Sequence, residues 1–478
     1  MRRNADPTSE RSARSKSICR RKMMSDIDAD LVIIGAGPAG MAAACEARAL
    51  NLSVLLLDEQ LTLGGQIYRN SEDAPPNLLE ILGKDYAKGR DLVEEFRKSG
   101  TQYLGGSTVW NICKNGKVDY IRGGSATSVK GFSVLLASGA LERPFPIRGW
   151  TLPGAMTAGA AQILLKSTGA VPTEPVVLVG CGPLLYLLAW QYLRAGVRIK
   201  ALVDTTETIG YLRAIPHSFA AFKGWRDLFK GLSLLATLKH YGVRVHSRVS
   251  ALELLGETEV TGISFREKGE LKSIDTSLVL LHQGVVPNVQ LSMSTDAPHR
   301  WDNVQLCWHP VVDAWGRMAD TAVYVAGDSG GIVGAKGSVI QGRLAALSVA
   351  QSLNVISDLK KRSLPLQMAL RQAKHIRPFL DKLYRPKDED RIPCHDDVVV
   401  CRCEEVTAGQ IRGYVKMGCT GPNQTKAFGR CGMGPCQGRL CSLTVTEIIA
   451  EASGRTPEDV GHYRIRSPVK PILLGDFG

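Results

Sequence analysis

A glycine-rich turn between an apolar strand and a helix constrains the fold of this chain more than any other feature. Residues 28–60 read DADLVIIGAGPAGMAAACEARALNLSVLLLDEQ. The run LVIIG is continuously apolar, as a strand buried in a parallel sheet requires. Gly35 permits a tight turn, Gly37 lets the backbone approach a pyrophosphate, and Gly40 allows close packing of the helix on the strand. The segment therefore predicts a βαβ unit that binds a dinucleotide.

An acidic residue follows at the position where such a unit binds ribose. Asp58 ends the second apolar strand, eighteen residues after Gly40, and an acid there can accept hydrogen bonds from ribose hydroxyls. Glu59 beside it is a weaker candidate for the same role. The glycine motif alone is a weak signal, but the preceding strand, the following helix and the spaced acid make it a stronger one.

A second copy of this pattern begins about 145 residues later but is altered. The segment PVVLVGCGPLLYLLAWQYLRAGVRIKALVD keeps Gly180 and Gly182, and Asp204 follows at the end of the next strand. Leu185 stands where the third glycine belongs, so the helix has to pack differently on its strand. Two interpretations stay open: a second nucleotide site, or a nucleotide-type domain that no longer binds one.

Length and charge exclude several classes of protein. With 478 residues, of which 44% are hydrophobic, the chain has room for roughly two to four domains. It has no run of about 18 apolar residues that would predict a transmembrane helix. The net charge of +13 is not gathered into a dense basic helix interleaved with aromatic residues, so we expect no nucleic-acid partner.

The N-terminal stretch carries much of the positive charge. Residues 1–24 hold eight Lys and Arg residues against Asp6 and Glu10, and such a composition predicts a disordered basic tail. Met24 is a plausible alternative start. The stretch lacks the apolar core of a secretory signal, so we expect a cytoplasmic location, with peripheral membrane association left open.

The order of the motifs predicts both a fold class and domain boundaries. Apolar strands that alternate with helices around two glycine motifs indicate an α/β protein with two dinucleotide-binding domains. The predicted layout is a tail (1–24), a first dinucleotide domain in two parts (25–160 and 286–356), a second such domain (161–285), a helical linker (357–397) and a cysteine-rich module with a tail (398–478).

Seven of the twelve cysteines lie between Cys394 and Cys441. In a reducing compartment such a cluster favours metal binding over disulfides. Cys401, Cys403, Cys431 and Cys436 form a C-x-C…C-x₄-C pattern, which supplies the four thiolates that either a [2Fe–2S] cluster or a tetrahedral zinc site requires. We expect Cys419 and Cys441 to be surplus packing residues, and spacing alone leaves both metals open.

The glycine motif GAGPAG, together with LLASGALERP and YVAGDSGG, resembles the two-dinucleotide-domain flavoproteins such as thioredoxin reductase. The resemblance implies that the first motif and the late Gly-Asp pair hold FAD and that the second domain is of the NAD(P)-binding type. The implied FAD contacts are Gly35, Gly37, Pro38, Ala39, Gly40, Asp58, Glu59, Gly65, Gln66, Gly139, Gly327 and Asp328. The chain has no C-x-x-C pair, so disulfide reduction is not expected of it.

The segments GWTLPGAMTAGAAQ, CRCEEVT and GCTGPNQTKAFGRCGMGPCQGRLC narrow the resemblance further. They are similar to the FAD-binding A-type subunits of multi-subunit amine and amino-acid dehydrogenases. The cysteine module is similar to bacterioferritin-associated ferredoxin, which implies a [2Fe–2S] cluster on Cys401, Cys403, Cys431 and Cys436. No Ser/His/Asp set, HExxH motif or pair of carboxylates stands out in the sequence, so we expect no catalytic side chain on this chain.

The same resemblance implies a division of labour within a complex. A B-type subunit similar to glycine or sarcosine oxidases, with its own FAD, would oxidise the C–N bond. FMN at the subunit interface is a further candidate cofactor, a small third subunit is a candidate partner, and a quinone or respiratory chain is the expected electron acceptor. Opines such as octopine or nopaline are the first expected substrates, followed by D-hydroxyproline or glycine.

Two alternatives remain at this point. One is a self-contained NAD(P)H-dependent flavin and iron–sulfur reductase, and the other is a redox-inert scaffold whose cysteines bind zinc. Flavin reduction by NADH would distinguish the reductase, and iron and sulfide analysis would distinguish the scaffold.

Overall fold

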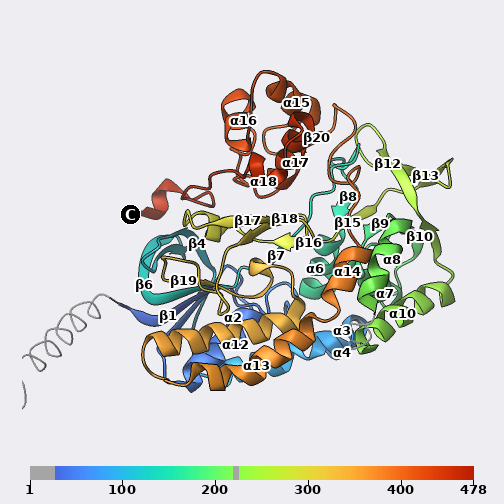
Figure 1. Cartoon of the computed structure of the whole chain (residues 1–478). Helices are drawn as coiled ribbons and strands as arrows, with labels where there is room; N and C mark the ends of the chain where they lie inside the picture. Colours follow the sequence, from blue (N-terminus) through green and yellow to red (C-terminus); the bar gives the residue numbers. More distant parts are fainter. Residues whose placement is uncertain (1–26, 219–224, 478) are drawn as a thin grey trace, which may run out of the picture.

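The first unit is built on a mostly parallel sheet of seven strands. A computed structural model describes residues 27–218 and 225–477 (Figure 1); the predicted basic tail, residues 1–24, lies outside the described residues. The strand order is β3-β2-β1-β6-β5-β4, and β19 pairs with β6. The strands are β1 (Ala29–Ile34), β2 (Val54–Asp58), β3 (Gln102–Gly105), β4 (Ser107–Ile112), β5 (Lys117–Arg122), β6 (Ser125–Leu136) and β19 (Val323–Val325).

The central strands β1, β2 and β6 are parallel, and their paired segments 31–34, 54–57 and 134–136 are apolar. Ile34 pairs in register with Leu57 on one side and Leu136 on the other, so the carboxyl ends of β1, β2 and β6 meet at one edge. Strands β4, β5 and β6 are antiparallel neighbours. Functional loops of an open parallel sheet gather at that carboxyl edge.

Two long helices cover one face of this sheet. Helix α2 (Pro38–Ala49) starts at the glycine turn, and α12 (Gly334–Ser352) crosses it. A Cβ on Gly342 would lie 2.1 Å from the Ala39 carbonyl oxygen, so only a glycine allows this approach. Helices α5 (Gly89–Lys98) and α13 (Leu359–Lys374) flank the pair. Short helices α3 (Pro76–Leu82) and α4 (Lys84–Ala87) precede α5.

The second unit has its own parallel sheet, in the order β11-β10-β9-β15-β8. Its strands are β8 (Ala155–Thr157), β9 (Val176–Cys181), β10 (Ile199–Asp204), β11 (Arg244–Ser247) and β15 (Val279–Gln283). Its helices are α6 (Ala158–Thr168), α7 (Pro183–Arg194), α8 (Thr208–Ala214), α10 (Trp225–His240) and the 3₁₀ turn η1 (Ile215–His217). Strand β8 enters this sheet slightly before position 161, where the sequence pattern places the start of the second domain.

Two short strands and a small sheet complete the second unit and its connections. Strands β7 (Ala140–Glu142) and β16 (Val285–Pro287) pair antiparallel where the chain leaves and re-enters the first unit. Strands β12 (Val249–Leu255), β13 (Gly262–Glu267) and β14 (Glu270–Asp275) form an antiparallel sheet.

The return to the first unit passes through a hairpin. Helix α11 (Gln290–Met293) precedes strands β17 (His299–Asp302) and β18 (Cys307–Pro310), and the 3₁₀ turn η2 (Gly327–Gly330) follows β19. The segment expected to be a helical linker holds α13 and then α14 (Arg377–Leu383), which packs against α8 of the second unit.

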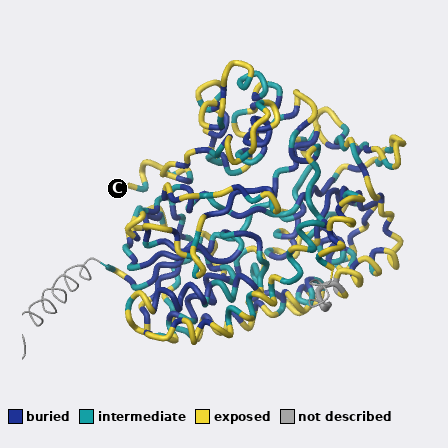
Figure 2. Tube along the Cα trace, in the orientation of Figure 1, coloured by how far each residue is buried: buried dark blue, intermediate teal, exposed yellow. Residues whose placement is uncertain are grey.

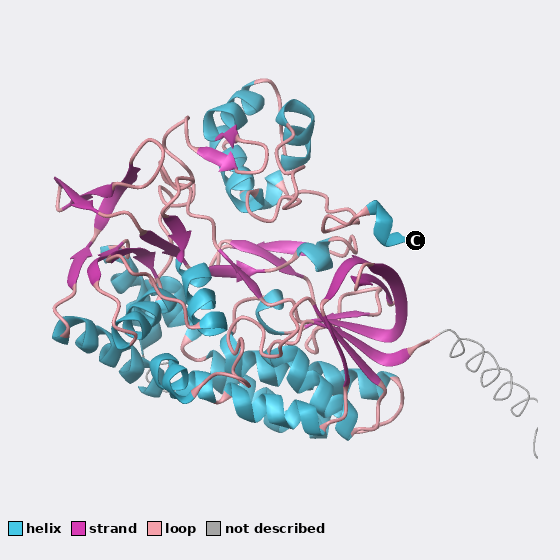
Figure 3. Cartoon of the chain, turned by 180° about the vertical axis from the view of Figure 1, so that it is seen from behind, coloured by secondary structure: helices cyan, strands magenta, loops and turns pink. Residues whose placement is uncertain are grey.

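The C-terminal module is small and helical, and it sits on the hairpin (Figures 1 and 3). Its elements are β20 (Val399–Cys401), β21 (Val406–Thr407), α15 (Ala408–Lys416), α16 (Pro422–Gly429), α17 (Ser442–Ser453), α18 (Pro457–Val460) and η3 (Leu474–Phe477). Thr407 and Gln410 form a reciprocal capping box at the start of α15.

The module shares a core with the first unit. Trp301 and Trp308 of the hairpin are buried in the same cluster as Val445 and Ile448 of α17. The ring of Trp308 lies 5.0 Å from that of His462, edge to face, and the Trp150 indole donates to the Val399 carbonyl at 2.7 Å. Figure 2 shows buried chain at this contact. None of the described helices is long and apolar enough to span a bilayer.

Candidate cofactor sites

The first glycine turn has the shape that a dinucleotide site requires. Gly35 has a φ of +108°, and a Cβ there would lie 2.4 Å from the Ala137 carbonyl oxygen, so a larger residue cannot form this turn. A Cβ on Gly37 would meet nothing closer than 3.9 Å, which leaves the approach to the turn open. No side chain among the described residues caps α2 at Gly37, so its first N–H groups are free to bind phosphate.

Asp58 lies at the end of β2, as predicted, and its carboxylate stabilises the glycine turn by hydrogen bonds to the backbone. Its Oδ2 accepts the Ala36 N–H at 2.5 Å, and its Oδ1 accepts the Gln60 N–H at 2.7 Å. Burial raises the pKa of Asp58, and these backbone hydrogen bonds oppose the rise. Each carboxylate oxygen retains a second lone pair for a ribose hydroxyl. Glu59 instead points to the C-terminal tail and pairs with Lys470.

The other predicted contacts gather at the same edge. The Gly64 N–H donates to the Ala36 carbonyl at 3.0 Å, and a Cβ on Gly65 would lie 2.8 Å from the Gly37 Cα. The loop that carries Gln66 is therefore packed directly on the glycine turn. A Cβ on Gly327 would lie 3.0 Å from the Ala39 Cβ, which places the Gly-Asp pair against the start of α2.

Asp328 and Gly139 flank this edge. The Asp328 Oδ1 accepts the N–H groups of Val333 and Gly334, both at 2.8 Å, where α12 begins. Gly139 has a φ of +69° and its carbonyl accepts the Asn288 N–H at 3.0 Å. The cradle of free N–H groups, the open turn and the carboxylates fit the pyrophosphate and sugar portions of FAD.

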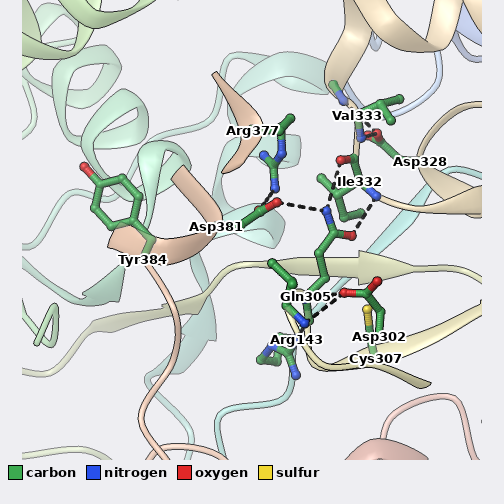
Figure 4. A network of polar contacts seen from close by, with 12 residues as sticks. Arg143, Asp302, Gln305, Cys307, Asp328, Ile332, Val333, Arg377, Asp381 and Tyr384 are labelled. Carbon is green, nitrogen blue, oxygen red and sulfur yellow. Dashed lines mark hydrogen bonds and ion pairs between the residues drawn. The ribbon is translucent and has the colours of Figure 1, made fainter. Parts of the chain in front are cut away.

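A polar network missing from the sequence-based prediction supports the Gly-Asp loop (Figure 4). The Gln305 amide accepts the Ile332 N–H at 3.0 Å and donates to the Ile332 carbonyl at 3.2 Å and to Asp381 at 3.3 Å. Asp381 also pairs with Arg377 of α14. Helix α14 is therefore tied to the loop that carries Asp328. Nothing in the local sequence indicated this contact, because it joins three distant segments.

The second glycine turn is filled by the chain itself. Leu185 is fully buried, so it fills the space beside the strand. The Asp204 carboxylate accepts the Tyr186 hydroxyl at 2.8 Å and the Thr206 N–H at 2.8 Å. Residues 382–391 lie against the carboxyl end of this sheet, where the carbonyl of the half-buried Tyr384 accepts a hydrogen bond from the Cys181 Sγ at 3.7 Å.

The cysteine module brings three thiols into one buried group. The Sγ atoms of Cys401, Cys431 and Cys441 lie within 4.8 Å of one another. Hydrogen bonds from Cys431 and Cys441 lower the pKa of Cys401, and the Gly432 N–H points at its Sγ at 3.5 Å. Backbone N–H groups directed at sulfur are typical of iron–sulfur sites.

Cys403 and Cys436 lie beside each other at the more exposed side of the module. Cys403 is exposed and Cys436 is half-buried, and contact with Cys403 contributes to the raised pKa of Cys436, whose main cause is burial. A Cβ on Gly434 would lie 2.2 Å from the Cys403 Cβ. The absence of a side chain at Gly434 therefore allows the two loops that carry Cys403 and Cys436 to lie close together.

The expectation that Cys441 stands apart from the other thiols needs correction. Cys441 is the residue that precedes α17, and this helix packs so that the Cys441 thiol lies near Cys401 at the end of β20. Sequence spacing could not show this, because it depends on the fold of the loop between Cys431 and Cys441. Cys419 does stand apart, with its Sγ donating to the Gly421 carbonyl at 3.3 Å. The set of metal ligands remains a prediction.

Comparison with known proteins decides the family. The model described as pyridine nucleotide-disulphide oxidoreductase matches residues 29–352, and the sarcosine oxidase A3 domain matches residues 397–478. The A subunit of opine oxidase from Rhizobium meliloti is 44% identical over 458 residues, covering 94% of this chain and 87% of that protein. The chain belongs to the family of opine oxidase A subunits. It is a subunit of an FAD-dependent oxidoreductase, as the sequence resemblance predicted.

Two further similarities are consistent with this placement. Hydrogen cyanide synthase subunit HcnB of Pseudomonas protegens is 28% identical and covers 93% of this chain and 97% of that protein. An L-proline dehydrogenase structure from P. horikoshii has a TM-score of 0.70 at 18% identity and covers 94% of this chain and 79% of that chain, which confirms the predicted two-domain fold. The comparisons give no support for FMN.

Proposed function

We propose that this chain is the electron-transferring subunit, with FAD and a [2Fe–2S] cluster, of a heteromeric dehydrogenase that oxidises the C–N bond of an amino acid or secondary amine. The observation that carries the proposal is the 44% identity to the A subunit of an opine oxidase, which extends along 94% of the chain. Opines are therefore the first proposed substrates, with D-hydroxyproline and glycine next.

The residues of this chain have binding and positioning roles in the proposal. The glycine turn at Gly35 and the free end of α2 would hold the FAD pyrophosphate, and Asp58 would hold its ribose. Bound FAD supplies reversible electron exchange. Asp328 and Gln305 fix the loop that closes the flavin side of the cradle.

The module would hold the iron–sulfur centre next to the flavin unit. Four thiols among Cys401, Cys403, Cys431, Cys436 and Cys441 would ligate iron, because a [2Fe–2S] cluster needs four thiolates. The core shared by the module and the hairpin keeps the thiol group in a constant position relative to the first unit. A rigid connection of this kind suits electron transfer, since the transfer rate depends on a fixed separation of the centres.

The main partner in the proposal is a catalytic B-type subunit with its own FAD. A quinone or respiratory acceptor and a small third subunit complete the proposed assembly. The similar opine oxidase chain is itself named as a subunit, which supports the presence of a partner.

The alternative of direct reduction by NAD(P)H is disfavoured by residues 382–391. These residues lie against the carboxyl end of the second sheet, which is the edge where a dinucleotide would bind. Electrons would then enter from the partner.

The test is to purify the chain alone and co-expressed with a B-type subunit from the same organism. FAD, iron and acid-labile sulfide are measured in both preparations, together with octopine and nopaline oxidation with a quinone dye. We expect FAD and iron in both and amine oxidation only in the complex. Amine turnover by the chain alone would contradict the division of labour, and rapid flavin bleaching by NADH would favour the reductase.

A further inference from the structure

Two positive side chains lie beside the loop that packs on the first glycine turn, and neither has a carboxylate partner among the described residues. The Lys166 Nζ donates to the Gln66 carbonyl at 3.1 Å and to the Gln162 amide oxygen at 2.9 Å. The Arg69 guanidinium donates to the Gln60 amide oxygen at 2.7 Å and to the Gln66 amide oxygen at 3.2 Å. All four acceptors are neutral.

Lys166 is buried, with 4% of its surface exposed. A buried ammonium with only neutral acceptors is costly unless an opposite charge is near. Its amide partner is itself buried: the Gln162 Nε2 donates to the Gln191 Oε1 at 2.9 Å, and the Gln191 Nε2 donates to the Leu82 carbonyl at 3.2 Å. This chain of amides holds Lys166 in place under the loop but leaves its charge uncompensated.

Among the described residues, none of the groups that contact Lys166 carries a negative charge. Arg69 is the charge that acts on it, and after burial it is the second cause that lowers the pKa of Lys166, to about 7. The Tyr86 ring centroid lies 6.0 Å from the Nζ, and burial raises the pKa of Tyr86 to about 12, so this phenol stays neutral. The other charged groups on neighbouring elements are Asp58, Glu72, Arg90 and the mutually paired Asp85 and Lys88.

Lys166 and Arg69 both contact Gln66, next to the first glycine turn. The loop of Gly64, Gly65 and Gln66 rests on the glycine turn that would hold a pyrophosphate. We propose that Lys166, assisted by Arg69, is a positioning residue that supplies positive charge under the FAD cradle and gains a proton when the anionic cofactor binds. This inference rests on the FAD site of the proposed function.

The direction of the proton linkage follows from the charges. An anion beside Lys166 stabilises its protonated form and raises its pKa, while the pyrophosphate of FAD stays ionised near neutral pH. Binding therefore takes up protons above pH 7, and the affinity for FAD falls as the pH rises. If the pKa rises by about two units, one group of this kind predicts roughly 0.7 proton taken up per FAD at pH 7.5, and an affinity weaker by a factor of about 12 at pH 8.5 than at pH 7.

The experiment titrates FAD into the flavin-depleted full chain between pH 6.5 and 8.5. Isothermal calorimetry in buffers of different ionisation enthalpy gives the protons taken up, and flavin fluorescence gives the affinity.

Lys166→Met should bind FAD more weakly, with an affinity that no longer depends on pH in this range. Lys166→Arg keeps the charge at every pH, so it should bind tightly with no proton uptake. Lys200→Met, at an exposed lysine of β10 that donates to the Asp275 carbonyl, should behave like the wild type.

The outcomes separate this inference from the proposed function. Equal proton uptake by the wild type and Lys166→Met, or none by the wild type, would overturn the role of Lys166 while leaving the FAD site in place. Failure of the wild type to bind FAD at any pH would overturn the cofactor site and the role of Lys166 together. Circular dichroism checks the fold of each variant; if Lys166→Met does not fold, pH-independent tight binding by Lys166→Arg still decides the question.

Discussion

The Sγ atoms of Cys401 and Cys441 lie within 4.8 Å of each other, although forty residues separate them in the chain. The contact joins the end of β20 to the first turn of α17. It brings a fifth thiol into a group for which sequence spacing had predicted four ligands. Cys441 is therefore a fifth candidate ligand beside the four that a four-thiolate centre requires.

The first prediction concerns the role of Cys441. We expect Cys441→Ser to lower bound iron and sulfide and to remove most of the visible absorption of the cluster, because its thiol lies in the buried group with Cys401. Cys419→Ser is the matched control, since the Cys419 thiol donates to the Gly421 carbonyl away from this group. Iron content per folded chain is measured after anaerobic purification. Full iron content in Cys441→Ser would show that Cys441 only packs beside the ligands.

The second prediction compares the two glycine turns. A Cβ on Gly37 meets nothing within 3.9 Å and faces the open cradle, so Gly37→Ala should leave stability nearly unchanged but weaken FAD binding at least about tenfold, which corresponds to about 1.4 kcal/mol. Gly180→Ala should do the opposite. Its Cβ would lie 1.7 Å from the His282 carbonyl oxygen, so the melting temperature should fall while FAD bound per folded chain stays the same.

Flavin absorbance and thermal unfolding of both variants check this contrast. If Gly180→Ala released FAD from a chain that remained folded, the second turn would have a direct part in cofactor binding. If Gly37→Ala bound FAD as tightly as the wild type, the pyrophosphate would not approach the backbone at this turn.

Local patterns were sufficient to predict the parts of the site that one βαβ unit contains. The strand, the glycine turn, α2 and Asp58 are within thirty residues of each other, and short-range sterics determine their arrangement. The same holds for the paired apolar strands of both sheets. The α/β class and the two-domain fold follow from these repeated local units.

The features that local patterns could not predict depend on segments that meet only in the folded chain. Lys166 reads as an ordinary helical lysine until α6 packs under the loop at Gln66. Residues 382–391 read as a charged linker, but the half-buried Tyr384 packs against the core of the second unit. Cys441 is one more case, since its position depends on the path of the loop before α17.

The third prediction tests the buried ion pair that anchors the module. Arg391 and Glu447 have side-chain exposures of 6% and 4%, and Arg391 also pairs with Asp388, whose side chain is exposed. Among the described residues, Glu447→Gln leaves the exposed Asp388 as the remaining carboxylate partner of the buried Arg391 guanidinium, so it should cost about 3 kcal/mol of unfolding free energy, the low end for breaking a buried pair. Glu72→Gln, which breaks the exposed pair with Arg97, should cost less than about 1 kcal/mol. Urea unfolding followed by cluster absorbance measures both, and equal costs would contradict the anchoring role.

The last prediction concerns the pH dependence of stability. Burial raises the pKa of Asp390 to about 7, against a weaker opposing effect of Lys387, whereas an unfolded aspartate has a pKa near 3.8. The folded chain therefore holds this proton more tightly than the unfolded chain, so ionisation of Asp390 destabilises the fold increasingly as the pH rises from about 4 to 7. Asp390→Asn removes the ionisation and keeps an acceptor for Gln283. Its melting temperature should exceed that of the wild type at pH 7.5, and the difference should shrink as the pH falls toward 4. A difference that is constant over this range would show that Asp390 is not the titrating group, while Asp275→Asn on the exposed edge of β14 should leave the profile unchanged.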